Sequence, residues 1–97
     1  MLVSTKEMLQ RARREGYAVP APNFFDLRSA SAYLEVAEAL NKPLILAFAQ
    51  AHMDQFDLED AAMIGRYLAK KASVPVALHL DHGTDETIIK KAIDLGF

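Results

Sequence analysis

The chain has 97 residues, of which 52% are hydrophobic and 25% are charged, with a formal net charge of −2 and no cysteine. These proportions describe one ordinary soluble globular segment. No lysine or arginine cluster indicates a nucleic-acid surface or a membrane-binding face, and the apolar runs are too short to span a bilayer. Without cysteine, any bound metal must use histidine, aspartate or glutamate. No secretory signal pattern opens the chain, so we expect a cytoplasmic protein.

The first twenty-two residues predict a helix followed by an extended segment. Ser4 and Glu7 have the spacing of a capping box, and Gly16 supplies a stop, so a helix is expected between residues 4 and 16. Residues 17–22 are expected to be extended. Their two prolines exclude a helix interior and argue against a conventional central strand.

Helices and strands then alternate. A second helix is predicted over residues 27–40, where apolar residues recur at helical spacing. The nearly continuous apolar run 44–49 is typical of a strand that is covered on both faces. A third helix, with Asp57 as its N-cap, precedes a further strand at residues 76–81.

The last predicted helix begins at Thr84, which we expect to cap its N-terminus ahead of Asp85 and Glu86. Gly96 is suited to its C-terminal end. Four apolar residues at helical spacing are expected to form its buried face: Ile88, Ile89, Ala92 and Ile93.

The pattern as a whole is one helix followed by three strand–helix units. This alternation indicates right-handed crossovers and a parallel sheet, and therefore the α/β class. The rhythm stops where a fourth strand is due, and three parallel strands would leave open sheet edges. We therefore expect residues 1–97 to be the N-terminal part of a single larger domain.

Residues 74–83 place His79, Asp81 and His82 at the C-terminal end of a predicted parallel strand. Ligands bind at this end in barrels and in open α/β sheets. Two-residue periodicity puts His79 and Asp81 on one face, and His82 begins the next loop. A carboxylate beside an imidazole suits a zinc-type ion and proton transfer. Structural roles stay open at this point: His79 as an interior histidine that orients its neighbours, and Asp81 as a helix cap.

The string Leu78–Gly83, which follows Val-Pro-Val, is very similar to the third-strand signature of class II fructose- and tagatose-bisphosphate aldolases. Four more segments resemble the same family, in the same order along the chain: 2–9, 17–24, 42–46 and 89–97. The resemblance implies the N-terminal three βα units, with a leading helix, of a TIM (β/α)8 barrel.

The resemblance also implies a zinc-dependent enzyme that reversibly cleaves fructose or tagatose 1,6-bisphosphate to dihydroxyacetone phosphate and glyceraldehyde 3-phosphate. In that family the metal polarises the ketone carbonyl, and no lysine Schiff base is used. By position, Asp81 resembles the residue that exchanges a proton with the sugar hydroxyl, His82 the first metal-binding histidine, and Asn23 an asparagine near the substrate. The other metal histidines would lie beyond residue 97, so we expect the fragment alone to be inactive and the full-length protein to be a homo-oligomer.

Several residues depart from the family pattern, among them Pro22 and Phe25, which replace commoner residues. Ala49 stands where the family usually has a serine that contributes to substrate contact. His52 is a local substitution that either touches a substrate phosphate or is a solvated loop histidine. Two other functions therefore stay open: a non-catalytic barrel relative that binds sugar phosphates, and a standalone structural or interaction module.

Overall fold

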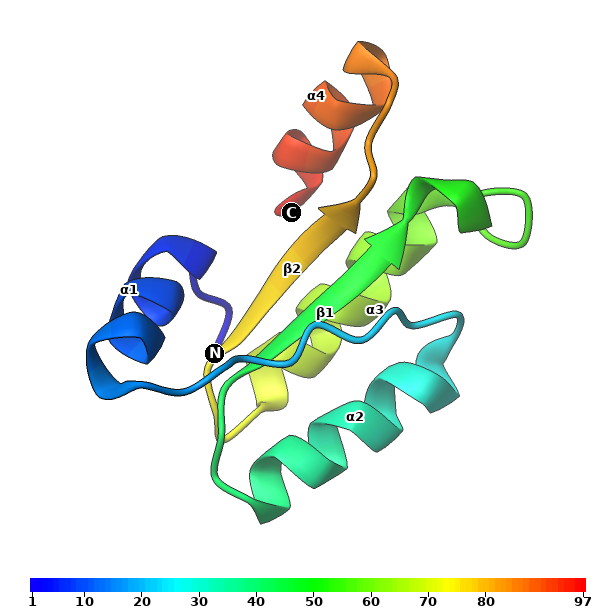
Figure 1. Cartoon of the computed structure of the whole chain (residues 1–97). Helices are drawn as coiled ribbons and strands as arrows, with labels where there is room; N and C mark the ends of the chain where they lie inside the picture. Colours follow the sequence, from blue (N-terminus) through cyan, green and yellow to red (C-terminus); the bar gives the residue numbers. More distant parts are fainter.

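Two parallel strands form the centre of the structure, a computed structural model that describes residues 1–97 (Figure 1). Strand β1 spans Leu44–Ala49 and strand β2 spans Val76–Asp81, as predicted. Around them lie four α-helices and one 3-10 turn: α1 (Thr5–Glu15), α2 (Leu27–Ala39), η1 (Gln50–His52), α3 (Leu58–Lys71) and α4 (Glu86–Leu95). The alternation of strands and helices confirms the α/β class. No helix combines the length and the apolar character that crossing a bilayer requires.

The first of the three expected strands is present as an extended segment and not as a regular strand. Along residues 17–24 the carbonyls of Pro20 and Pro22 each accept a backbone hydrogen bond from β1 at 3.1 Å, and the amide of Phe24 donates one to β1 at 2.9 Å. The segment therefore runs parallel beside β1, as Figure 1 shows. Its prolines lack the N–H groups that a regular ladder needs, so only β1 and β2 form the named sheet.

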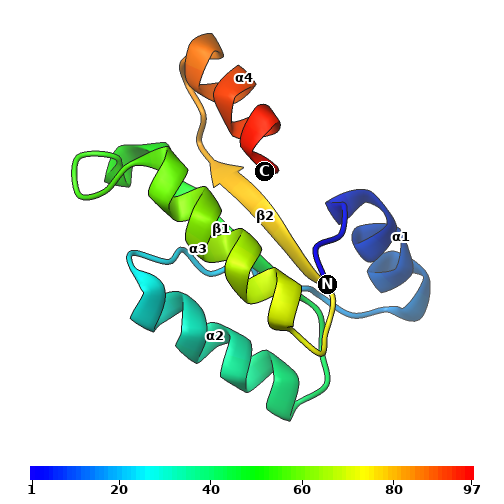
Figure 2. The same ribbon diagram turned by 180° about the vertical axis from the view of Figure 1, so that it is seen from behind.

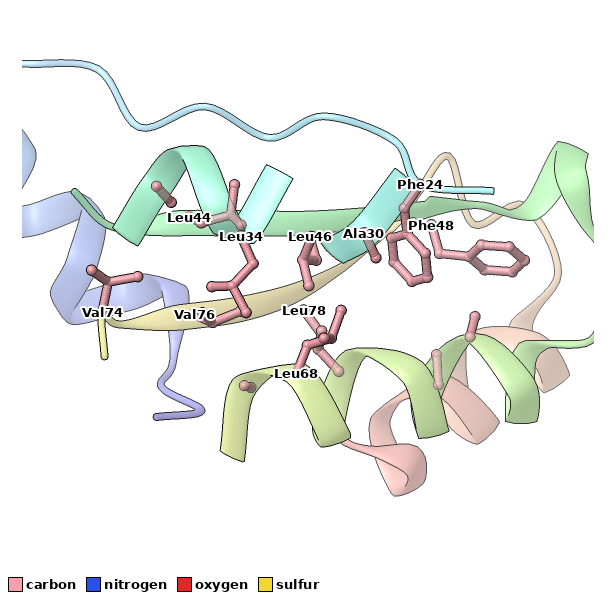
Figure 3. Packing of buried hydrophobic residues seen from close by; sticks show 14 of the residues in the cluster. Phe24, Ala30, Leu34, Leu44, Leu46, Phe48, Leu68, Val74, Val76 and Leu78 are labelled. Atoms are coloured by element: carbon pink, nitrogen blue, oxygen red, sulfur yellow. The ribbon is translucent and has the colours of Figure 1, made fainter. Parts of the chain in front are cut away.

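The two faces of the sheet differ in what covers them. Helices α2 and α3 lie side by side over one face (Figure 2) and bury the larger core between them and the strands. Side chains that point into this core come from both strands and both helices: Leu34, Leu44, Leu46, Phe48, Leu68, Val76 and Leu78 (Figure 3). Because successive side chains of a strand point to opposite faces, Ala47, Ala49, His79 and Asp81 lie on the other face.

Helix α1 covers that second face only near the N-terminal ends of the strands. Met8 of α1 packs on Ile45 and Ala77, near the N-terminal ends of the strands. Towards the C-terminal ends no helix lies over the strands, and Figure 1 shows this open side facing the viewer. The fold thus leaves one edge of the sheet accessible, on the side where both strands end.

The ends of the helices follow the sequence signals in part. Gly16 and Gly96 end α1 and α4 in the left-handed conformation, with φ of 73° and 102°, as expected. Ser4 caps α1 by accepting a hydrogen bond from the amide of Lys6, but the reciprocal capping-box bond from Glu7 does not form. Asp57 occupies the N-cap position of α3 without a side-chain bond. A capping box does form at α2, between Asp26 and Ser29.

The prediction for the start and the buried face of α4 was wrong in two respects. Asp85, not Thr84, is the N-cap: its carboxylate accepts from two helix amides at 2.8 and 3.2 Å. Ala92 is buried and Ile88 packs against the core, but Ile89 and Ile93 are 38% and 64% exposed. The helical pattern identifies the apolar face correctly, but helix α3 covers only part of it, and Ile89 and Ile93 stay exposed within residues 1–97.

An ion pair fastens α4 to α3. Lys91 of α4 binds Glu59 in the first turn of α3. The hydrogen bond from Lys91 is the largest cause of a lowered pKa for the Glu59 carboxyl. Both side chains are about half exposed, so the pair contributes little to the stability of the fold.

Candidate active site

The candidate site lies where β1 and β2 end. The two strands pair in register from Leu44 with Val76 to Ala49 with Asp81, so they finish at the same level. The bridge between Asn23 and Ala47 brings the end of the extended segment to this edge as well. Residues from three segments far apart in the sequence therefore meet at the C-terminal edge, the edge at which parallel α/β sheets bind ligands.

A hydrogen bond joins two of the predicted site residues. The side-chain amide Nδ2 of Asn23 donates to Oδ2 of Asp81 at 3.1 Å, across 58 positions of sequence. The hydroxyl of Tyr33, on α2, donates to the backbone carbonyl of Asn23 at 3.0 Å. Tyr33 of α2 thus holds the backbone of Asn23, while the side chain of Asn23 binds one oxygen of the Asp81 carboxylate. The contribution of Tyr33 was not predicted, because its helical spacing explains it equally well as a packing residue.

The third predicted site residue stands next to this carboxylate. Nε2 of His82 lies 3.7 Å from Oδ1 of Asp81, the oxygen that Asn23 does not hold. The side chain of Asp81 is 30% exposed and that of His82 is 91% exposed. His82 adopts φ of 53°, a left-handed conformation that is uncommon outside glycine. This conformation ends the strand abruptly and leaves the imidazole outside the packed part of the molecule.

These residues fit part of a metal site. An imidazole beside a hydrogen-bonded carboxylate has the donor chemistry that zinc accepts. No group of three or more potential ligands from histidine, aspartate and glutamate comes together within the 97 residues. Since zinc in proteins takes at least three protein ligands, His82 and Asp81 do not by themselves complete a zinc site.

The two structural interpretations of the same string can be compared with the structure. His79 lies on the face of the sheet opposite helices α2 and α3, the face that points inward in a (β/α)8 barrel, and its side chain is exposed within residues 1–97. Its interpretation as an interior histidine therefore stays a prediction. Asp81 is not a helix cap, because Asp85 fills that position. The geometry of Asp81 is therefore explained by its contacts with Asn23 and His82.

Ala49 and His52, which depart from the family pattern, lie at the end of β1 and in the 3-10 turn that follows it. Ala49 is buried and lies opposite Asp81 in the register. The ring of His52 packs on Phe25 with centroids 4.8 Å apart, and its Nδ1 is buried without a hydrogen-bond partner. His52 is therefore not fully solvated. Because its Nδ1 is enclosed, only its other ring nitrogen is free to contact a ligand.

The loops after β1 and β2 are joined by a pair of hydrogen bonds. Nε2 of Gln50 donates to Oγ1 of Thr84 at 3.0 Å, and the amide of Thr84 donates to Oε1 of Gln50 at 2.8 Å. Thr84 is thus bound to the neighbouring loop and does not cap α4. No signal in the sequence pairs these residues, because the contact depends on how the two strands align.

Together these features define an α/β protein with a polar edge at the carboxyl ends of its parallel strands. Comparison with known proteins is specific about the family. The family model for class II fructose-bisphosphate aldolases matches residues 3–97. The chain belongs to the class II fructose-bisphosphate aldolase family.

Several aldolases are similar to this chain in sequence. It is 41% identical over its whole length to a fructose-bisphosphate aldolase of Thermus caldophilus, and 38% identical over 98% of its length to a D-tagatose-1,6-bisphosphate aldolase subunit of Klebsiella oxytoca. It is also 40% identical over 99% of its length to a 6-phospho-5-dehydro-2-deoxy-D-gluconate aldolase of Halalkalibacterium halodurans. The chain spans only about a third of these relatives, 32% to 34% of their length.

The fold agrees with a solved aldolase structure. The whole chain superposes on the crystal structure of the YdjI aldolase from Escherichia coli K12 with a TM-score of 0.95 at 28% sequence identity, and covers 38% of that protein. The arrangement of strands and helices is therefore that of the corresponding part of an aldolase, consistent with the first three βα units of a (β/α)8 barrel.

Proposed function

We propose that this chain provides the first three βα units of a zinc-dependent class II aldolase. The reaction is the reversible cleavage of a ketose 1,6-bisphosphate, fructose or tagatose, to dihydroxyacetone phosphate and glyceraldehyde 3-phosphate. The observation that carries the proposal is the pair at the end of β2: the Asp81 carboxylate held by Asn23, with the free imidazole of His82 beside it. The proposal includes a cytoplasmic location and a homo-oligomeric state.

In this proposal His82 is one ligand of the zinc ion. Polarisation of a ketone carbonyl oxygen is the chemistry that such an ion supplies when bound. His82 suits this role because its side chain is 91% exposed, so its imidazole is accessible to a metal ion. The neighbouring carboxylate would favour binding of a cation at this position.

Asp81 moves the proton. Its carboxylate takes the proton of the hydroxyl group at the carbon–carbon bond that breaks, and that hydroxyl becomes the aldehyde of one product. The electron pair of the bond passes to the ketone-bearing product, and a second acid/base group outside residues 1–97 would supply the proton to its carbon that completes dihydroxyacetone phosphate. In the synthetic direction Asp81 returns the proton. Asn23 holds Oδ2 at 3.1 Å, which leaves Oδ1 as the oxygen that exchanges the proton. The side-chain oxygen of Asn23 stays available for a substrate hydroxyl.

The substrate assignment rests on the names of the relatives. They act on fructose bisphosphate, tagatose bisphosphate and a phosphorylated dehydro-deoxy-gluconate. We propose a ketose bisphosphate because the Thermus and Klebsiella proteins both carry names of that class. Ala49 favours a second candidate, a relative that binds sugar phosphates without turnover, because the hydroxyl usual at this position is absent opposite Asp81.

The test uses the protein of natural length. Purified protein is incubated with fructose 1,6-bisphosphate or tagatose 1,6-bisphosphate, and triose phosphate release is followed before chelation, after chelation and after zinc is restored. We expect cleavage that chelation abolishes and zinc restores. A folded, zinc-loaded protein that cleaves neither sugar would refute the enzymatic proposal, and sugar phosphate binding without cleavage would identify the second candidate.

A further inference from the structure

The hydrogen-bonded pair Gln50 and Thr84 lies outside the residues assigned to the reaction. Gln50 opens the loop after β1, and Thr84 lies two residues after His82 in the loop after β2. Both polar ends of the Gln50 amide are used, as donor at 3.0 Å and as acceptor at 2.8 Å. A planar amide held by two bonds fixes the orientation of its partner as well as its distance.

The segment that this pair restrains is short and carries the site. His82 lies between Asp81, the last residue of β2, and Thr84, with only Gly83 between them. Its φ of 53° is a conformation that non-glycine residues rarely adopt without support from their surroundings. The side chain of His82 itself is 91% exposed, so its own packing does not hold it in place.

Contacts on the two sides of His82 supply the missing support. Before it, Asp81 is held by the register with β1 and by Asn23. After it, Gly83 packs so closely that an added Cβ would lie 2.8 Å from Leu80 and 2.9 Å from Ile89. Thr84 is the next residue, and its only recorded hydrogen bonds join it to Gln50.

We propose that Gln50 is a positioning residue for His82. By holding Thr84 it fixes the backbone turn from which the imidazole projects, and so presets the direction in which His82 meets the metal ion. This inference rests on the proposed function, since it assumes that His82 binds zinc. Residues that orient metal ligands typically change metal affinity by 10- to 100-fold when they are removed. Because Gln50 acts through two residues of backbone, we expect about tenfold, the lower end of that range.

The experiment compares five single variants of the natural-length protein. Gln50→Ala removes both bonds, and Thr84→Val removes only the acceptor at Oγ1. Gln50→Glu and Thr84→Ser are the conservative variants: the two oxygens of a glutamate can accept from the amide and from the hydroxyl of Thr84, and serine keeps both bonds. Gln55→Ala is the matched control, an exposed glutamine five residues further along the same connection, for which no side-chain bond is found.

Two readouts are measured on each metal-free protein: the dissociation constant for zinc, by competition with a chelator, and deuterium exchange of the peptide that covers residues 82–85. We expect about tenfold weaker zinc binding and faster exchange for Gln50→Ala, a smaller loss for Thr84→Val, and near-normal values for the other three variants. With zinc saturating, kcat should recover, because the proton-transfer residues are untouched.

The possible results distinguish a failure of the positioning role of Gln50 from a failure of the proposed function. Faster exchange in Gln50→Ala with unchanged zinc affinity would overturn the positioning role, because the bonds would then matter only for the loop. Unchanged values in both readouts would overturn it as well. A wild-type protein that binds no zinc would refute the proposed function, and the role of Gln50 with it; a wild-type protein that binds zinc and cleaves substrate, with Gln50→Ala indistinguishable from it, refutes the role of Gln50 alone.

Discussion

Replacing Asp81 by asparagine tests the proton-transfer role with little structural disturbance. The variant has nearly the same shape, and its amide oxygen can still accept the hydrogen bond that Asn23 now donates at 3.1 Å. Asp81 does not cap α4, because Asp85 does, so the helix start is unaffected. What the variant loses is the ability to accept a proton from a substrate hydroxyl.

The two consequences differ in size. Exchanging a charged acceptor for a neutral one in a single hydrogen bond costs about 1 kcal/mol of folding free energy. General acid–base catalysis contributes about 10²- to 10⁴-fold to the rate, which corresponds to roughly 3–5 kcal/mol of activation free energy. A catalytic Asp81 therefore predicts a large loss of kcat in a protein whose unfolding free energy changes little.

The assay combines turnover, zinc content and a urea unfolding curve on one preparation of the natural-length variant. We expect kcat to fall by about 10²- to 10⁴-fold while zinc content and the unfolding midpoint stay close to those of the wild type. Near-normal kcat would refute the catalytic role of Asp81. Loss of zinc together with activity would instead identify Asp81 as a metal ligand.

Three further predictions follow from other parts of the chain. Gly65→Ala would bring a Cβ within 2.5 Å of a methyl carbon of Leu78, so we expect about 1–3 kcal/mol of destabilisation in denaturant unfolding, and a change under 0.5 kcal/mol would contradict the packing. The lowered pKa of Glu59, bound to Lys91, contributes stability above the ordinary glutamate pKa of 4.5 that is lost as the pH falls through the folded-state value; hydrogen exchange in α4 should rise there, and Glu59→Gln should remove that dependence. The isolated 97-residue chain should show no turnover even with zinc added, since its ligand set is incomplete; measurable cleavage by pure protein would contradict this.

Local signals predicted the elements well, because they depend on neighbouring residues. The apolar run of β1 and the glycines after α1 and α4 act within one turn or one strand, and the structure confirms them. The segment before α2 was predicted to be extended but not a conventional central strand. Pro20 and Pro22 explain this, because a proline cannot donate a backbone hydrogen bond to a neighbouring strand. Long-range pairing was not needed for any of these predictions.

The features that the sequence could not predict depend on the register of the strands and on which elements pack against each helix. Asn23 reaches Asp81 only because two alignments, of the extended segment with β1 and of β1 with β2, bring their ends to one level. Thr84 and Asp85 are both residue types that cap helices; in the structure Asp85 caps α4, and Thr84 binds Gln50 on another loop. Periodicity likewise identifies the apolar face of α4 but not the element that covers it.

The metal role of His82 is the central claim, and the chain offers its own controls, because His52 and His79 are its only other histidines. The most direct measurement is the zinc content, per mole of natural-length protein, of three single variants in which each histidine is replaced by alanine. The proposal predicts that His82→Ala loses zinc, while His52→Ala and His79→Ala keep it, because His52 packs on Phe25 and His79 lies lower on the open face. Full zinc content in His82→Ala would contradict the proposal.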